Sequence, residues 1–275
     1  DKTMVQKLYM MKESKSVMKK YLKNFLRYKY LLTELVKKNI KLKYRRSYLG
    51  ILWTLIEPLL TMIVLTLVFG TLLGHKEKSF PVYILTGRLM YTLFSQSTTS
   101  ALKSIRQNEA MIKKVYVPKY LYPLANICFN YILFLISLVV LAVVALVLGV
   151  FPTWRTLLAI VPLLNLFLLS IGAGMILATI GVYFRDMEYL WNVALMLIMY
   201  TCAIFYYPKK ILNSNVSWIL KFNPLFCIIN NFRNCVFGRA MSAHMLIYSF
   251  TFAFVCIVIG IAVFNKKQDQ FILHL

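Results

Sequence analysis

KLKYRRSYLGILWTLIEPLLTMIVLTLVFGTLLG, residues 41–74, joins a basic cluster to a 24-residue apolar run that a single charge, Glu57, interrupts. About 20 apolar residues cross the ~30 Å hydrocarbon layer of a bilayer as a helix, because a helix satisfies its own backbone hydrogen bonds in lipid. The run therefore predicts a transmembrane helix. The basic cluster predicts which end of that helix stays in the cytoplasm.

The composition extends this interpretation to the whole chain. Hydrophobic residues make up 60% of it, charged residues only 15%, and the mean hydropathy is +0.68, which is unlike a soluble domain. Five further apolar windows cover residues 80–102, 121–150, 156–184, 189–208 and 240–264. Arg88 in the first of these windows is the single Asp, Glu, Lys or Arg that the five contain. We therefore predict an all-α polytopic membrane protein with six transmembrane helices.

The distribution of basic residues predicts the orientation. With six spans, 23 Lys and Arg residues fall on the side of the N-terminus and 8 on the other side. The positive-inside rule then places both termini in the cytoplasm, and no signal peptide is expected before the first span. The predicted organisation is a cytoplasmic segment 1–50, a transmembrane domain 51–264 and a cytoplasmic tail 265–275. The net charge of +23 would face anionic lipid headgroups rather than nucleic acid.

Residues 16–29, SVMKKYLKNFLRYK, place their apolar side chains on one helical face and most of their Lys and Arg residues elsewhere. This pattern favours an amphipathic helix that lies at the membrane interface. A soluble helix packed on a partner subunit is the alternative.

The segment 103–120 is a basic cytoplasmic loop that carries an unexpected set of apolar residues. These are Ala110, Met111, Ile112, Val115 and Tyr116. Exposing them to water would be unfavourable, so we predict a short helix that presents a surface to a partner protein. The alternative is a loop held inside by its charge, with its apolar residues resting on the bilayer.

The external segment 208–239 is more apolar than a loop should be, yet it is not a continuous span. Pro224 disfavours a helical conformation at Asn223 in mid-segment, and Lys221 and Arg233 stand on either side of this break. We predict two short re-entrant helices that dip into the outer leaflet and gate an exit. Irregular backbone at this depth must be buried in protein or line a water-filled space.

Two ionisable residues lie inside predicted spans, where a charge costs a few kcal/mol. Glu57 and Arg88 each lie about two turns into a span. They either line a polar conduit, pair with each other, or have a structural role near the headgroups. Aromatic residues gather toward the outer end of the fifth span and suit either stacking on sugar rings or a membrane-interface belt. They are Tyr200, Phe205, Tyr206 and Tyr207.

Motifs for catalysis and metal binding are absent from the sequence. No GxxxxGK[ST] phosphate-binding loop occurs, so this chain is not expected to bind ATP. It also contains no known catalytic motif, so it is not expected to be an enzyme. The three histidines are too dispersed to suggest a metal site. The five cysteines read as small core residues, although a disulfide between Cys227 and Cys235 is possible.

Several segments in register resemble a known family. They are YRRSYLGILWTLIEPLLTMIVLTLVFG (44–70), FPVYILTGRLMYTLFSQ (80–96), MIKKVYVPKYLYPLAN (111–126), YFRDMEYL (183–190) and FNPLFCIINNFRNCVFG (222–238). With the spacing of six spans, they are similar to the permease subunits of ABC exporters for O-antigen, teichoic acid and related cell-surface polysaccharides. The resemblance covers nearly the whole chain.

The resemblance implies a half-transporter in the bacterial cell membrane. Two copies would form the pathway for a lipid-linked polysaccharide, and two copies of a separate ATPase subunit would bind ATP and Mg. The loop 103–120 would dock on the ATPase through residues that match the family's coupling helix. These are Glu109, Met111, Ile112, Lys113, Lys114, Val115 and Tyr116. This chain itself would bind no cofactor.

The candidates for lining the canal are the two intramembrane charges and aromatic residues of three spans. They are Trp53, Glu57, Arg88, Tyr91, Tyr200, Phe205 and Tyr206. Two other functions compete with polysaccharide export. One is an ABC efflux permease for a small lipid or drug. The other is a membrane-embedded transferase for lipid-linked sugars, which should group acidic or histidine residues on loops, where only Asp186 and Glu188 come close.

Overall fold

A computed structural model of the protein describes residues 28–72, 74, 77–114, 117–208 and 217–271, and within these ranges the regular structure is helical, without strands. The all-α prediction is thus confirmed for the described part of the chain. The predicted amphipathic helix 16–29 lies outside it, apart from its last two residues, which open a helix over residues 28–44.

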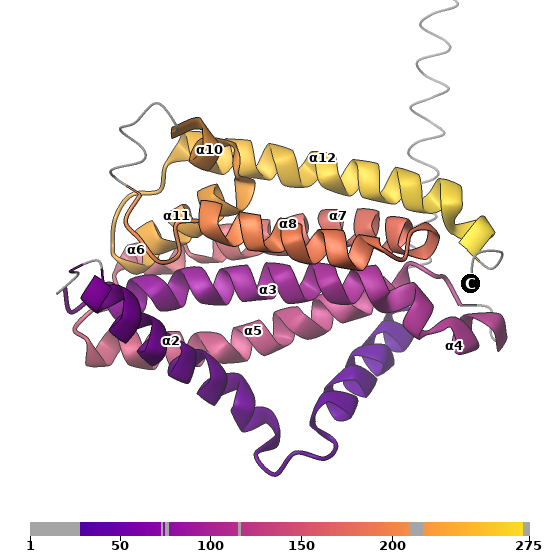
Figure 1. The fold of residues 1–275 in the computed structure, drawn as a ribbon, viewed down its shortest axis with the longest axis horizontal. Coiled ribbons are helices and arrows are strands. Elements are labelled where there is room, and N and C mark those ends of the chain that lie inside the picture. Colours follow the sequence, from indigo (N-terminus) through magenta and orange to yellow (C-terminus); the bar gives the residue numbers. More distant parts are fainter. Residues whose placement is uncertain (1–27, 73, 75–76, 115–116, 209–216, 272–275) are drawn as a thin grey trace, which may run out of the picture.

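The long helices run side by side along the longest axis of the molecule (Figure 1). After the helix over residues 28–44 come η1 (Gly50–Leu52), α2 (Trp53–Leu72), α3 (Phe80–Gln107), α4 (Glu109–Lys114), α5 (Leu121–Val147), α6 (Trp154–Leu157), α7 (Ile160–Tyr183), α8 (Met187–Thr201), α10 (Ser217–Phe222), α11 (Pro224–Val236), α12 (Ala243–Lys267) and η2 (Gln268–Gln270).

Four helical segments of the described chain are long and apolar enough to cross a membrane. They are Gly50–Leu72, Leu121–Val147, Trp154–Tyr183 and Ala243–Gln270, and they match four of the six predicted spans. The other two predicted spans correspond to α3 and α8. The 28-residue α3 carries Arg88, Lys103 and Arg106, and α8 has 15 residues, so neither is a spanning helix by length and composition alone.

Helix α3 is more polar than the four apolar segments, and it lies at the centre of the molecule. It packs against α2, α5, α7, α8 and α11, and buried residues recur along it from Phe80 to Ile105. Its neighbours therefore cover its polar side chains, and a helix in this position does not need an apolar outer surface.

Helix α12 packs mainly on α7, and glycines bring the two backbones together. A Cβ on Gly172 would lie 2.7 Å from Cβ of Cys256, and a Cβ on Gly260 would lie 2.9 Å from the carbonyl oxygen of Gly172. Small residues are the usual means of such close approach between membrane helices. Gly172 thus serves packing within this chain.

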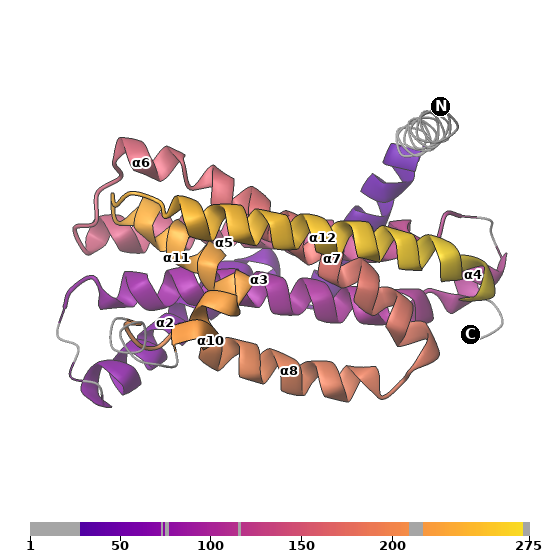
Figure 2. The same ribbon diagram turned by 90° about the horizontal axis from the view of Figure 1, so that it is seen from above.

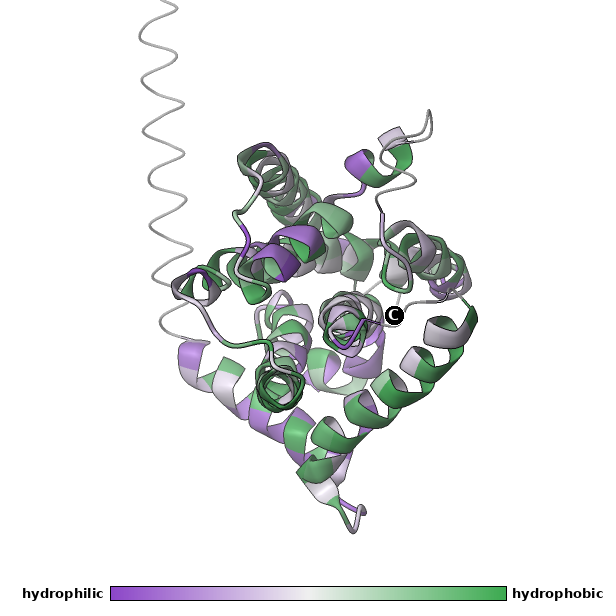
Figure 3. Ribbon diagram, turned by 90° about the vertical axis from the view of Figure 1, so that its left-hand side faces the viewer, coloured by the Kyte–Doolittle hydropathy of each residue, from purple (hydrophilic) through white to green (hydrophobic). Residues whose placement is uncertain are grey.

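The short elements gather at opposite ends of the long helices. The helix α4 and the end of α12 lie at one end, whereas α6, α10 and α11 lie at the other (Figures 1 and 2). The helix over residues 28–44 and α2 diverge from the other helices and meet at their tip. Figure 3 shows hydrophobic residues over most of α2 and many hydrophilic residues on the helix over residues 28–44.

The predicted break at Pro224 is confirmed. Asn223 has extended backbone angles, φ −81° and ψ 108°, between α10 and α11. Its side-chain oxygen accepts hydrogen bonds from the backbone N–H groups of Leu225 (3.0 Å) and Phe226 (3.3 Å), which caps α11. Residues 209–216 of the predicted re-entrant segment lie outside the described part.

Candidate functional site

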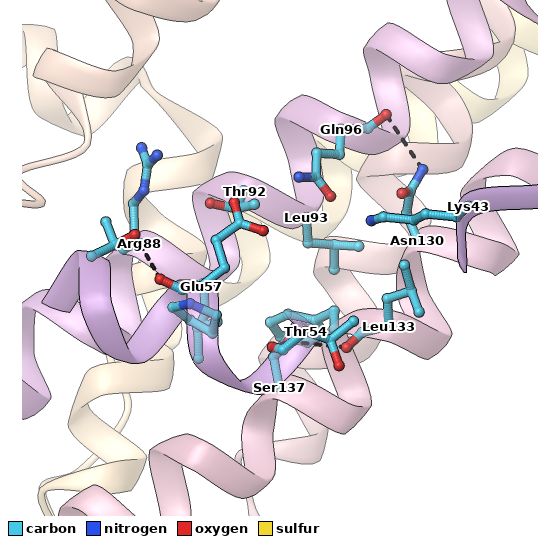
Figure 4. Close-up of a pocket in the computed structure, with 14 residues that line it drawn as sticks. Lys43, Thr54, Glu57, Arg88, Thr92, Leu93, Gln96, Asn130, Leu133 and Ser137 are labelled. Atoms are coloured by element: carbon cyan, nitrogen blue, oxygen red, sulfur yellow. Dashed lines mark hydrogen bonds between the residues drawn. The ribbon is translucent and has the colours of Figure 1, made fainter. Parts of the chain in front are cut away.

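A polar pocket of about 70 Å³ lies between α2, α3, α5 and the end of the helix over residues 28–44 (Figure 4). The residues that line it are Lys43, Thr54, Glu57, Pro58, Thr61, Arg88, Leu89, Thr92, Leu93, Gln96, Asn130, Leu133, Phe134 and Ser137. Three residues with charged side chains and several with hydroxyl or amide groups thus border one pocket.

The polar side chains reach the pocket because of helical spacing. Arg88, Thr92 and Gln96 follow one another at intervals of four residues on α3, so they lie on one face. On α2, Thr54 and Glu57 are three residues apart, which also places them on one side. The hydroxyl of Ser137 on α5 donates to the backbone carbonyl of Thr54 (2.9 Å) and so joins two walls of the pocket.

Hydrogen bonds continue the pocket along α3. The Asn130 amide nitrogen donates to the hydroxyl of Ser100 (2.9 Å). The amide nitrogen of Asn126 donates to the Ser100 carbonyl (2.9 Å) and its side-chain oxygen accepts from Asn39 (2.7 Å). We call the whole set the polar seam: Asn39, Lys43, Thr54, Glu57, Thr61, Arg88, Thr92, Gln96, Ser100, Asn126, Asn130 and Ser137. From Arg88 to Ser100 it follows α3 for ~18 Å, at 1.5 Å per residue.

Glu57 and Arg88 both line this pocket, but they do not form an ion pair with each other in the described part of the protein. The guanidinium of Arg88 points away from Glu57 (Figure 4) and contacts the Met199 sulfur at 3.7 Å. It also lies 5.9 Å from the ring centroid of Tyr91. Pairing within one subunit, one of the interpretations from sequence, is therefore not what holds these charges.

Lys43, from the end of the helix over residues 28–44, adds a third charged side chain to the lining of the pocket. Partial burial lowers the pKa of Lys43, and the carboxylate of Glu57 counteracts this effect by favouring the charged form. The two groups therefore act on each other electrostatically across the pocket, without a direct hydrogen bond being needed.

The aromatic candidates for the canal are spread over the molecule. The buried Tyr91 donates its phenol hydrogen bond to the carbonyl of Leu195 on α8 (2.8 Å). Phe205 is also buried and stacks on Phe69 with ring centroids 4.7 Å apart. Tyr206 donates to the Tyr200 carbonyl (2.9 Å).

Two of the aromatic candidates are exposed in the single chain. Trp53, at the start of α2, is 45% exposed, and Tyr200, at the end of α8, is 56% exposed. The structure thus brings Glu57 and Arg88 into one pocket, with Tyr91 beside Arg88, and gathers Tyr200, Phe205 and Tyr206 around the end of α8 instead.

Most of the polar seam is not marked by charged residues within the predicted spans. Thr92, Gln96, Asn130 and Ser137 are uncharged, and Lys43 precedes the first span. A repeat of polar residues at intervals of four, starting from Arg88, is the sequence signal for three further members of the seam. These are Thr92, Gln96 and Ser100.

The predicted coupling residues up to Lys114 lie in the helix α4, which has one buried and one charged side. Glu109 pairs with Lys113 across one turn (2.5 Å), and Lys113 and Lys114 are exposed. Ile112 is 7% exposed and belongs to a core that includes Leu35. Ile112 therefore packs within this chain, and its contact with a partner subunit stays a prediction. Met111 is half-buried, and Val115 and Tyr116 lie outside the described residues.

No group of His, Cys, Asp or Glu side chains that could hold a metal ion occurs in the described ranges. All five cysteines are free, so the possible disulfide between Cys227 and Cys235 is not formed. The arrangement at the polar seam offers hydrogen-bonding and charged groups to a polar ligand, and nothing in its geometry resembles a nucleophile with an adjacent base.

Comparison with known proteins agrees with the family that the sequence resembles. The model of the ABC-2 type transporter family matches residues 30–237. The O-antigen export system permease protein RfbA of Klebsiella pneumoniae is 27% identical over 243 residues, covering 88% of this chain and 93% of the relative. RfbA of Myxococcus xanthus is 27% identical over 246 residues, covering 89% and 95%. The polysialic acid transport protein KpsM of Escherichia coli is 22% identical over 236 residues, covering 84% and 91%.

Proposed function

Because this chain belongs to the ABC-2 type transporter family, we propose that it is the membrane subunit of an ATP-driven exporter of a cell-surface polysaccharide. The observation that carries this proposal is the near full-length match to permeases named for O-antigen export and polysialic acid transport. The four apolar helices support a multi-pass protein of the cell membrane. The polymer would leave the cytoplasmic side attached to a lipid carrier.

The polar seam supports this proposal physically. A sugar chain carries many hydroxyl groups, and moving them through hydrocarbon without hydrogen-bond partners would cost several kcal/mol per group. The seam supplies such partners over ~18 Å of α3, more than half of the ~30 Å hydrocarbon thickness. Glu57 and Arg88 contribute charged groups at one end of it, which fits a role in lining the canal.

The exporter would contain two copies of this chain. Most of α2 is unburied, with Thr54 and Met62 as its buried residues, and α8 buries Leu195 alone among its described residues. These faces are free to contact lipid or a second copy. A canal between two copies would place two polar seams around one pathway.

ATP and Mg would belong to a separate ATPase subunit that docks on α4. Lys113 and Lys114 project from this helix at one end of the molecule. ATP drives transport only if its binding favours one arrangement of the permease over another, and α4 is the element through which this difference would reach α3. The proposed boundaries remain a segment 1–50, a membrane domain 51–264 and a tail 265–275.

At the opposite end, α10 and α11 would form the re-entrant segment that gates the exit. Their polar break at Asn223 lies against the end of α8, because the amide nitrogen of Asn223 donates to the hydroxyl of Thr201 (2.9 Å). The break therefore has its polar groups satisfied within the protein, as it must if it lies at membrane depth.

Deletion of the gene, with complementation, tests the proposal in cells that carry it. We expect loss of the surface polysaccharide, measured with a specific antibody, and accumulation of the lipid-linked polymer inside, measured by mass spectrometry of extracted lipids. The wild-type gene should restore both. The control is a strain that lacks the polymer's first glycosyltransferase, which should lose the surface polymer without accumulating the lipid-linked form.

The same strains separate export from the competing functions. Normal surface polymer together with increased sensitivity to amphiphilic drugs would indicate an efflux permease. Polymer that still reaches the surface with altered sugar composition would indicate a transferase. Either result would contradict the proposed function.

A further inference from the structure

Arg233 is a buried cation without a carboxylate partner in the described ranges. It is 3% exposed, it lies in α11, and none of the ion pairs of the described chain includes it. A charge removed from water is strongly unfavourable unless other groups compensate it. The surroundings of Arg233 must therefore supply neutral acceptors.

Backbone carbonyl groups of two other segments supply them. Nη1 of Arg233 donates to the carbonyl of Ala203 (2.9 Å). Nη2 donates to the carbonyls of Tyr83 (3.0 Å) and Ile204 (3.4 Å), and Nε donates to the hydroxyl of Thr86 (3.4 Å). The guanidinium also lies over the ring of Tyr83, 3.5 Å from its centroid, in a cation–π contact.

The local backbone of α3 and of the turn after α8 is adapted to this guanidinium. A Cβ on Gly87 would lie 2.3 Å from Nη2 of Arg233, so the α3 face has room for the guanidinium only because residue 87 is glycine. Ala203 adopts a positive φ of 47°, which is unfavourable for a residue with a side chain. The phenol of Tyr83 donates to the same Ala203 carbonyl (3.1 Å).

The turn 202–204 that Arg233 holds is the outer end of α8. The amide of Asn223, which caps α11, contacts the same turn through the Cys202 sulfur (3.3 Å). The other end of α8 is held by Glu188, which pairs with Lys103 (2.9 Å) and with Arg106 of α3. Helix α8 is thus attached to α3 at both ends, and one of these ends is next to α4.

We infer that Arg233 is a positioning residue that locks the outer ends of α3, α8 and α11 in the closed arrangement of the exporter. This inference rests on the proposed function and extends it to the control of the exit. Separation of the turn 202–204 from α11 would remove the Ala203 and Ile204 carbonyls from the guanidinium and leave it with the Tyr83 carbonyl and the Thr86 hydroxyl of α3 alone. The lock therefore opens only when movement of α8 gives Arg233 water or another acceptor, which ties opening of the exit to the transport cycle.

Cys202 is a native reporter of this lock, because its thiol is fully buried in the turn that Arg233 holds. The experiment uses spheroplasts with the full exporter, in which the other four cysteines are replaced by serine or alanine. An impermeant maleimide is added from outside to energised or ATP-depleted spheroplasts. Labelling of Cys202 and surface polymer are both measured.

We expect wild-type Cys202 to be protected without ATP and to react during transport. Arg233→Gln should react roughly tenfold faster without ATP, because loss of the lock shifts the population toward the open arrangement. Arg233→Lys should lie between the two, since an ammonium cannot reproduce the planar set of donors. The matched control is Arg239→Gln, which removes an exposed arginine a few residues away and should behave like the wild type.

Two results would overturn the inference. One is a Cys202 that stays protected in the wild type while export proceeds, since the lock would then never open. The other is an Arg233→Gln protein that exports and protects Cys202 like the wild type. If Arg233→Gln fails to assemble, the ATP dependence of the wild-type labelling and the Arg233→Lys protein still decide. A different result would count against the proposed function instead. It is ATP-dependent labelling of Cys202 in a wild-type protein that brings no polymer to the surface.

Discussion

At the scale of single residues, Glu57 and Arg88 are explained by their neighbours in the fold. Glu57 and Arg88 look isolated in the sequence, yet in the fold they border a pocket lined by hydroxyl and amide groups (Figure 4). A charge beside water and polar side chains costs far less than one in hydrocarbon. Because no intrachain ion pair joins them in the described structure, the two residues should act independently.

A double-mutant cycle at these positions checks this expectation. Glu57→Gln and Arg88→Leu should each lower export about tenfold, and the double variant should lower it about a hundredfold, with additivity within ~0.5 kcal/mol. The midpoint of thermal unfolding in detergent should change little. Neither residue belongs to an ion pair in the described structure, so neither substitution leaves a charge without its ion-pair partner. Surface polymer measured by flow cytometry gives the export rate. Glu34→Gln, on the helix over residues 28–44, is the control and should export normally.

A double variant that exports better than either single variant would contradict independence. It would mean that Glu57 and Arg88 pair across two copies of the chain, since removal of one member of a buried pair costs more than removal of both.

At the scale of elements, the sequence predicts the helices and breaks that depend on local residues, but not those features that depend on packing between helices. Apolar length alone located α5, α7 and α12, and Pro224 located the break between α10 and α11. The extension of α3 to Gln107 was missed, because its last turns leave the apolar window but continue as an amphipathic helix.

The polar seam needed the tertiary structure. The interval of four residues on α3 predicts that Thr92 and Gln96 share a face, but nothing local says that Asn130 of α5 and Lys43 lie opposite that face. The same holds for Arg233, whose partners are backbone carbonyls 29 to 150 residues away in the sequence. Every residue has a backbone carbonyl group, so the sequence does not mark which carbonyls accept hydrogen bonds from Arg233.

Burial of Ile112 in α4 changes the result expected when this residue is replaced. An apolar residue in a basic loop suggested a partner contact, but the buried Ile112 stabilises α4 against the chain's own core. Replacing Ile112 with Asp should therefore cost ~3–5 kcal/mol of stability, through a lost core contact and a buried charge. Such a variant would test folding rather than coupling.

Charge reversal on the exposed side of α4 tests coupling instead. Lys113→Glu combined with Lys114→Glu should reduce copurification of the ATPase subunit at least tenfold, about 1.4 kcal/mol or more, because the reversal would place like charges opposite any acidic groups of the ATPase that the two lysines contact. The thermal midpoint should fall only slightly, since both side chains are exposed and replacing the Glu109–Lys113 pair with two like charges costs about 0.5 kcal/mol. Copurification is measured by quantitative mass spectrometry of the solubilised complex.

The control for this charge reversal is Lys78→Glu at the opposite end of the molecule. It changes an exposed lysine and should leave copurification unchanged. Equal recovery of the ATPase with the doubly reversed α4 would remove α4 from the docking surface.

At the scale of the whole molecule, the long helices separate two sets of short elements. The end with α4 and the end of α12 holds the segments predicted to be cytoplasmic, and the end with α6, α10 and α11 holds those predicted to be external (Figures 1 and 2). Four segments qualify as spans by composition. Whether α3 and α8 also cross decides between six spans and four.

Cysteine labelling of two pairs of positions answers this question one helix at a time, in a background without native cysteines. Lys78 and Gln107 flank α3, and Asp186 and Arg239 are exposed on the two sides of the segment that begins with α8.

If α3 crosses, a cysteine at position 78 should react with an impermeant maleimide in spheroplasts, and one at 107 should react only after permeabilisation. If α8 crosses, positions 239 and 186 should differ in the same way. Six spans require both differences. We expect α3 to cross, because a helix surrounded by α2, α5, α7 and α8 can do so without facing lipid, and its polar composition then does not count against it. Equal reactivity of 78 and 107 from outside would place both ends of α3 on one side of the membrane and would leave the polar seam without a path across the bilayer.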